Sequence, residues 1–255
     1  MRDEHILDEA LASLQTIWVS SEGLERWEFE LRRQEKIIRS FCRTAPVRAY
    51  YLLGLVATLR QDVLAMRSCF RNALVHSAHD PDIQRAYGIC LVRFGIYAEA
   101  REQYEAILSR HGEDVETLAE LIITSLATGR IQDGVRWMQR WSRLSPDRPF
   151  DEMDAICKSA ALLERYGISD DHVERLQRLA TAILARESLN VHTIHYRGVP
   201  LEDPEWIAAD VVVDESEEVL EGLNSKLSRI LHTNAPPPRL AEVIRFSYSA
   251  TKSVP

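Results

Sequence analysis

The sequence lacks a long apolar run, and this absence argues against a helix that crosses a membrane. Such a helix needs roughly 18 to 20 uncharged apolar residues, and no stretch of the 255-residue chain approaches that length. The N-terminus also lacks the basic segment followed by an apolar one that marks an export signal. We therefore expect a soluble, cytoplasmic protein with no membrane partner.

Cysteine and glycine are scarce as well. The four cysteines are far apart and form no C-x-x-C pair, so the spacing predicts neither a zinc module nor a disulfide framework; they are Cys42, Cys69, Cys90 and Cys157. The ten glycines form no phosphate-binding loop, and neither a G-x-S-x-G nor an H-E-x-x-H motif occurs. We expect no enzymatic activity, no cofactor and no bound metal.

An excess of positive charge is also missing. The chain has 31 Lys and Arg against 39 Asp and Glu, a net charge of −8, which repels phosphate backbones. Nucleic acid is therefore not the expected partner. One basic run could bind RNA or an acidic peptide through charge and stacking, although a solvated helix face is the better interpretation; its residues are Arg136, Trp137, Arg140, Trp141, Arg143 and Arg148.

The sequence does contain an internal repeat of 34 residues. Gly54 and Gly88 are 34 positions apart, and so are Gly95 and Gly129. Around them, two apolar stripes with helical spacing keep the same register in each unit, and the break between the stripes falls at Gly95 or Gly129, where a helix end tolerates a positive φ. The prolines of Asp80-Pro81 and Ser145-Pro146 mark the ends of units. Each unit is therefore predicted to be a helix hairpin.

Residues 94–100 (FGIYAEA) and 128–134 (TGRIQDG) stand where the tetratricopeptide repeat family has its turn and the start of its second helix. Over about residues 47–148 the chain resembles a tetratricopeptide array of three units. The middle unit matches the family pattern best, at Gly88, Leu91, Gly95, Ala100 and Tyr104. A helical bundle without repeats is the alternative.

The flanking patterns complete the expected organisation. Residues 1–46 contain two amphipathic helices that would cap the array, and residues 47–188 hold the repeats, with a divergent fourth unit. Residues 189–255 alternate as strands around one helix; the expected strands are 191–196, 207–213 and 243–248, and the helix follows Asp214. The predicted fold is mainly α: a tetratricopeptide-like helix-hairpin solenoid followed by a small α+β module with the order β-β-α-β.

In tetratricopeptide proteins the first helix of each hairpin lines a concave groove that receives a segment of a partner. Carried over by register, the groove positions are Tyr51, Leu55, Thr58, Arg85, Ile89, Val92, Ala119, Ile123 and Leu126. Most are apolar, so the resemblance implies a partner with apolar anchors, each contributing about 1.5 to 3 kcal/mol of burial, with Arg85 as a polar contact. Tyr51 and Leu55 replace the Lys and Asn of binders of chaperone tails, so that function is not implied.

The sequence therefore favours a protein that binds another polypeptide, as an adaptor, a scaffold or a chaperone-like factor similar to the small tetratricopeptide chaperones of bacterial secretion. Two alternatives stay open. The C-terminal module could be the ligand-binding or catalytic part, with His192, His195 and Asp210 as its polar groups, while the repeats present it. The chain could also form a homodimer through the edge of the strand at 243–248.

Metal binding and acid catalysis have weaker support. His192 and His195 would point to opposite faces of a strand, and His76 and His79 lack a third ligand nearby in the sequence. A set of acids near the expected second strand could supply paired carboxylates, but solvation and helix capping explain it better; the set is Glu202, Asp203, Glu205, Asp210 and Asp214.

Overall fold

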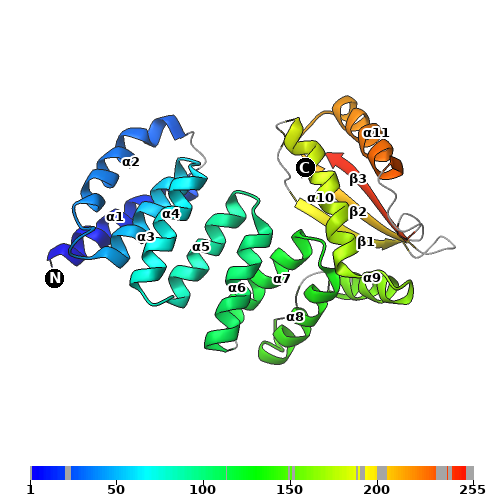
Figure 1. Cartoon of the computed structure of the whole chain (residues 1–255), viewed down its shortest axis with the longest axis horizontal. Coiled ribbons are helices and arrows are strands. Elements are labelled where there is room, and N and C mark those ends of the chain that lie inside the picture. The colour runs from blue at the N-terminus through cyan, green and yellow to red at the C-terminus, as the bar shows by residue number, and fades with distance from the viewer. Residues whose placement is uncertain are drawn as a thin grey trace. The chain divides into compact units, whose positions relative to one another are not determined.

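The computed structural model divides the chain into two compact units, residues 1–112 and 113–255. The residues that it describes are 2–20, 24–112, 114–148, 150, 153–187, 189, 193–199, 206–233, 240 and 243–250. Helices predominate, as expected (Figure 1). This division by packing does not test the segment boundaries expected at 46/47 and 188/189, which stay predictions. No helix among the described residues is long and apolar enough to cross a membrane.

The first unit consists of helices only. They are α1 (Arg2–Val19), α2 (Leu24–Arg39), α3 (Pro46–Leu59), α4 (Val63–His76), α5 (Pro81–Arg93) and α6 (Tyr97–His111). The second unit continues with helices and ends in a sheet: α7 (Val115–Ala127), α8 (Ile131–Leu144), α9 (Met153–Arg165), α10 (Asp170–Arg186), β1 (Thr193–Val199), β2 (Trp206–Val213), α11 (Glu217–Thr233) and β3 (Ile244–Ala250). Neighbouring helices pack as hairpins, which confirms the predicted hairpin pattern.

The same turn joins the two helices of four successive hairpins. Its left-handed residue is Gln61, Gly95, Gly129 or Gly167, with φ between 59° and 78°. One residue later, a backbone N–H donates to the carbonyl five residues back at 2.9 Å in all four turns; the pairs are Asp62 to Ala57, Ile96 to Leu91, Arg130 to Ser125, and Ile168 to Leu163. This is the Schellman end of a helix, which glycine favours because it has no Cβ.

A second contact repeats within the first unit. A Cβ on Gly54 would lie 2.7 Å from Cε2 of Phe70, and a Cβ on Gly88 would lie 2.5 Å from Cε1 of Tyr104. In both hairpins the glycine therefore lets an aromatic ring of the second helix lie directly against the first helix. This close approach explains why a glycine recurs 34 residues apart in the sequence.

Polar contacts link the two hairpins of the first unit. Arg67 of α4 pairs with Glu99 of α6 at 2.5 Å, and the Tyr87 hydroxyl of α5 donates to the same carboxylate at 2.6 Å. The rings of Phe70 and Tyr87 also stack, with centroids 5.2 Å apart. At the other end of the unit, α1 packs on α2 and α3 through a stripe that is almost fully buried, formed by Leu7, Ala10, Leu14 and Ile17.

The sheet of the second unit has the strand order β1-β2-β3. The central strand β2 is antiparallel to β1 and parallel to β3, and α11 is the crossover between the parallel strands. The β-β-α-β order predicted from the sequence is confirmed, with β1 and β3 at the two edges.

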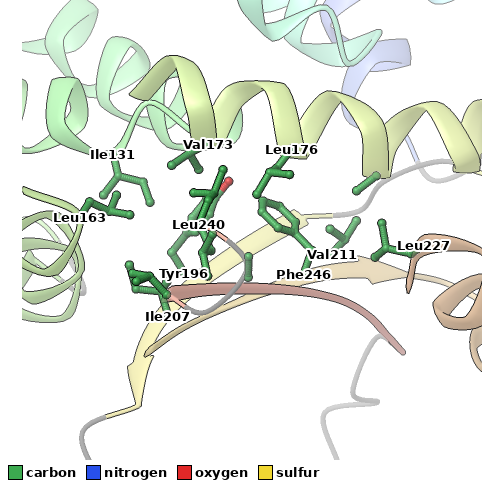
Figure 2. Close-up of a cluster of buried hydrophobic side chains, with 14 of the residues drawn as sticks. Ile131, Leu163, Val173, Leu176, Tyr196, Ile207, Val211, Leu227, Leu240 and Phe246 are labelled. Atoms are coloured by element: carbon green, nitrogen blue, oxygen red, sulfur yellow. The ribbon is translucent and has the colours of Figure 1, made fainter. Parts of the chain in front are cut away.

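Helix α10 covers one face of this sheet (Figure 2). Val173 and Leu176 of α10 point towards Tyr196, Val211 and Phe246 of the three strands. Side chains of the preceding hairpins, among them Ile131 and Leu163, join the same buried cluster. The helices α8 to α10 and the sheet therefore share one hydrophobic core.

Candidate binding pocket

An apolar pocket lies between three helices of the first unit and has a volume of about 220 Å³. Helix α1 contributes Leu11, Leu14, Gln15 and Trp18, α3 contributes Tyr51 and Leu55, and α5 contributes Ala86, Ile89 and Cys90. Tyr51, Leu55 and Ile89 are three of the nine groove positions expected from the sequence, and the pocket brings them together.

Helical spacing explains why these side chains meet. Tyr51 and Leu55 are four residues apart on α3, so they lie on one face, and α5 presents Ile89 beside them. The wall formed by α1 was not anticipated. Its apolar face is wider than one neighbouring helix requires: one stripe is buried against α2 and α3, while Leu11 and Trp18 beside it line the pocket. That extra width was visible in the sequence.

The pocket can bind a ligand but offers little acid–base chemistry. Ile89 is 39% exposed, so the apolar wall is accessible. Burial raises the pKa of the Cys90 thiol to about 11, against the opposing effects of a Thr58 hydrogen bond and the Arg93 charge. Burial likewise raises the pKa of Tyr51. Both groups are protonated at neutral pH, and a thiol is not a nucleophile in that state.

A cation stands beside the pocket. The guanidinium of Arg93 lies 4.3 Å from the centre of the Trp18 ring, and Trp18 lines the pocket. Arg93 is exposed at the end of α5. Within the described part of the chain, no carboxylate forms an ion pair with it.

Three other expected groove residues of this unit lie outside the pocket lining. Thr58 is buried, and its hydroxyl donates to the Gly54 carbonyl of its own helix at 2.8 Å. Arg85 pairs with Asp82 at 3.5 Å and has a side chain that is 20% exposed. Val92 is half-buried on α5.

The remaining three expected positions lie on α7, in the second unit. Ala119 is half-buried, and Ile123 is 46% exposed. Leu126 packs beside Gly134, where a Cβ would come within 2.9 Å of its Cδ2. None of the three lines the pocket of the first unit.

The C-terminal module brings two of its three expected polar groups together. His195, Asp210 and Ser247 occupy one row across β1, β2 and β3, and the Ser247 hydroxyl donates to Oδ1 of Asp210 at 2.9 Å. In a nucleophilic triad the imidazole stands between hydroxyl and carboxylate, whereas here the carboxylate is central, so this row does not activate the serine. His192 lies outside the described residues, as do Glu202, Asp203 and Glu205.

The arginine and tryptophan run on α8 serves packing. Arg140 lies 5.1 Å from the ring of Trp137, and the Trp141 indole donates to the Arg148 carbonyl at 2.6 Å. Both indoles also pack against the core of the second unit. They are therefore not open platforms for stacking bases. No cluster of three or more metal-ligating side chains occurs in the described portion of the sequence.

Comparisons with protein-family models, with curated proteins and with solved structures find no match for this chain.

Proposed function

We propose that the protein binds a segment of another polypeptide in the pocket between α1, α3 and α5, and acts as an adaptor, a scaffold or a chaperone-like factor. The supporting observation is that three apolar positions expected from repeat register line one accessible pocket: Tyr51, Leu55 and Ile89. An accessible apolar hollow in a folded protein is a common place for a ligand or partner to bind.

We also propose that the hairpins form a tetratricopeptide array. Two repeated features support this proposal: the Schellman turn that closes four hairpins, and the glycine that admits an aromatic ring in the two hairpins of the first unit. Both follow the 34-residue spacing on which the resemblance rests.

The size of the pocket limits what it can accept. An apolar cavity of about 150 Å³ holds a benzene molecule, so a pocket of about 220 Å³ has room for one large side chain. One buried anchor contributes about 1.5 to 3 kcal/mol, which does not offset the cost of association by itself. The partner must therefore also contact the surface around the pocket.

The test is affinity purification of the intact protein, wild type beside a Leu55→Glu/Ile89→Glu variant, with mass spectrometry of the co-purifying proteins. The matched control is Leu64→Glu/Val75→Glu, because these residues of α4 are 78% and 73% exposed and receive the same charges outside the pocket. We expect one specific protein to disappear with the pocket variant and to stay with the control. Circular dichroism must show that both variants are folded.

A partner retained by both variants would contradict the proposal. The alternative, in which the C-terminal module carries the function, has a variant of its own: His195→Ala/Ser247→Ala changes the outer row of the sheet. Loss of the partner with that variant alone would move the function to residues 189–255.

A further inference from the structure

We propose that the segment bound in the pocket is acidic next to its apolar anchor: a large apolar side chain fills the pocket, and a carboxylate about one helical turn away binds Arg93. This inference rests on the proposed function and specifies the chemistry of the partner. It starts from the position of Arg93, three and four residues after Cys90 and Ile89 of the pocket wall. Residues with that spacing share one face of a helix.

Trp18 fixes the position of this charge. Its ring belongs to the pocket lining and holds the Arg93 guanidinium at 4.3 Å from the ring centre. Stacking on an aromatic face leaves the N–H groups at the edge of the guanidinium free to bind a carboxylate in the same plane. Because the group is already ordered, less conformational entropy is lost when a carboxylate binds.

The other described cations near this end of the unit have acidic partners within the chain. Arg48 pairs with Asp8 of α1, Arg60 with Glu28 and Glu35 of α2, and Arg67 with Glu99. Arg93 differs, since no described carboxylate forms an ion pair with it. Its charge is therefore available to a partner.

The charge of the whole unit does not oppose this recognition. Residues 1–112 contain 15 Lys and Arg and 15 Asp and Glu, so the net charge of −8 lies in residues 113–255. An acidic segment that approaches the first unit meets a balanced surface with one exposed cation beside an apolar hollow. Complementary charge of this kind fixes register and partner choice more than it adds affinity.

The test is selection from a displayed library of random peptides on the intact protein. Wild type is compared with Arg93→Glu and with Arg71→Glu, a control at an exposed arginine of α4 outside the pocket lining. We expect wild type and control to enrich peptides with a large apolar residue and with Asp or Glu two to four positions away. Arg93→Glu should keep the apolar residue and replace the acids by Lys or Arg.

The selected peptide is then measured by fluorescence anisotropy. Arg93→Gln should weaken its binding by roughly 3- to 10-fold, as expected for a partly exposed charge-assisted contact, and added salt should shrink the difference. Arg71→Gln should leave the affinity unchanged. Circular dichroism spectra that match wild type would show that the variants are folded.

The outcomes separate the two proposals. Apolar enrichment without an acidic preference, or a preference that survives Arg93→Glu, would overturn the inference about charge while leaving the pocket as the binding site. Peptides whose binding is unaffected by Leu55→Glu/Ile89→Glu would overturn the proposed function itself.

Discussion

The side chain of Asn224 binds both backbone hydrogen-bonding groups of Tyr248. Its amide donates to the Tyr248 carbonyl at 3.1 Å, and its oxygen accepts from the Tyr248 N–H at 2.8 Å. Because β3 is an edge strand, these backbone groups would otherwise be open to a further strand. Asn224 thus occupies part of the edge through which the sequence suggested a homodimer, and that homodimer stays a prediction.

We predict that Asn224→Ala lowers the free energy of unfolding by about 1 to 3 kcal/mol, because two backbone groups lose their partners. The open edge should also increase self-association, measured by size-exclusion chromatography at rising concentration. Ser225→Ala, at an exposed neighbour on the same helix, is the control and should behave as wild type. A monomeric Asn224→Ala with unchanged stability would show that the edge needs no protection.

Asp170 caps a helix to which it does not belong. Its carboxylate accepts from the N–H groups of Gln132 and Asp133 at the start of α8, both at 2.9 Å, and α8 has no side-chain cap from its own N-cap residue. We predict that Asp170→Ala costs about 1 to 2 kcal/mol of stability, measured by urea unfolding. Asp171→Ala, whose side chain is 83% exposed, should cost much less; equal losses would assign the effect to the charges around Arg130.

Two glycines of the repeat should respond to alanine for different reasons. In Gly88→Ala the new methyl would lie 2.5 Å from the ring of buried Tyr104, and such overpacking costs about 1 to 3 kcal/mol. Gly95 has open space around it but a φ of 70°, so Gly95→Ala should cost about 1 kcal/mol through backbone strain. Thermal unfolding of both variants tests this order, and a more damaging Gly95→Ala would contradict the close approach at Gly88.

The first unit should lose stability in acid partly through Glu30. A hydrogen bond from Gln34 is the main cause that lowers the pKa of Glu30 below its ordinary value of 4.5, against the opposing effect of burial; Ser13 of α1 and Arg33 add to the lowering. A lowered folded-state pKa stabilises the fold above the ordinary value, and this stabilisation is lost as the pH falls through the folded-state pKa.

We therefore predict that Glu30→Gln destabilises the protein at about pH 7 and that its difference from wild type shrinks towards about pH 3, where both side chains are neutral. Thermal unfolding across this range measures the effect. Glu102→Gln, at an exposed carboxylate of α6, is the control. A constant difference between Glu30→Gln and wild type at every pH would contradict the assignment.

Local patterns predicted the elements well because each depends on nearby residues. The hairpin turns follow from Gly95 and Gly129, and the order of the C-terminal strands and helix follows from alternating apolar residues. The fourth turn lies at Gly167, 38 residues after Gly129, in agreement with the divergent spacing seen in the sequence. Gln61 has the same backbone conformation without being glycine, so composition alone did not reveal that turn.

The contacts that the sequence did not predict join residues far apart in the chain. Spacing placed Tyr51, Leu55 and Ile89 on one face, but it gave no sign that Trp18 of α1 would lie beside them. Thr58 matched the groove register and yet bonds its own helix. Likewise, nothing local indicates that Gln177 of α10 joins the Ala127 carbonyl to the Tyr196 hydroxyl. Such contacts depend on how helices pack, which periodicity does not determine.

The shared core of the second unit has a practical consequence for cutting the chain. A fragment that stops near residue 188 would expose Val173 and Leu176, which the strands cover, and such a surface promotes aggregation. Deleting the sheet therefore does not leave intact repeats behind. Shortened versions for expression should instead begin after Gly112 and retain β3.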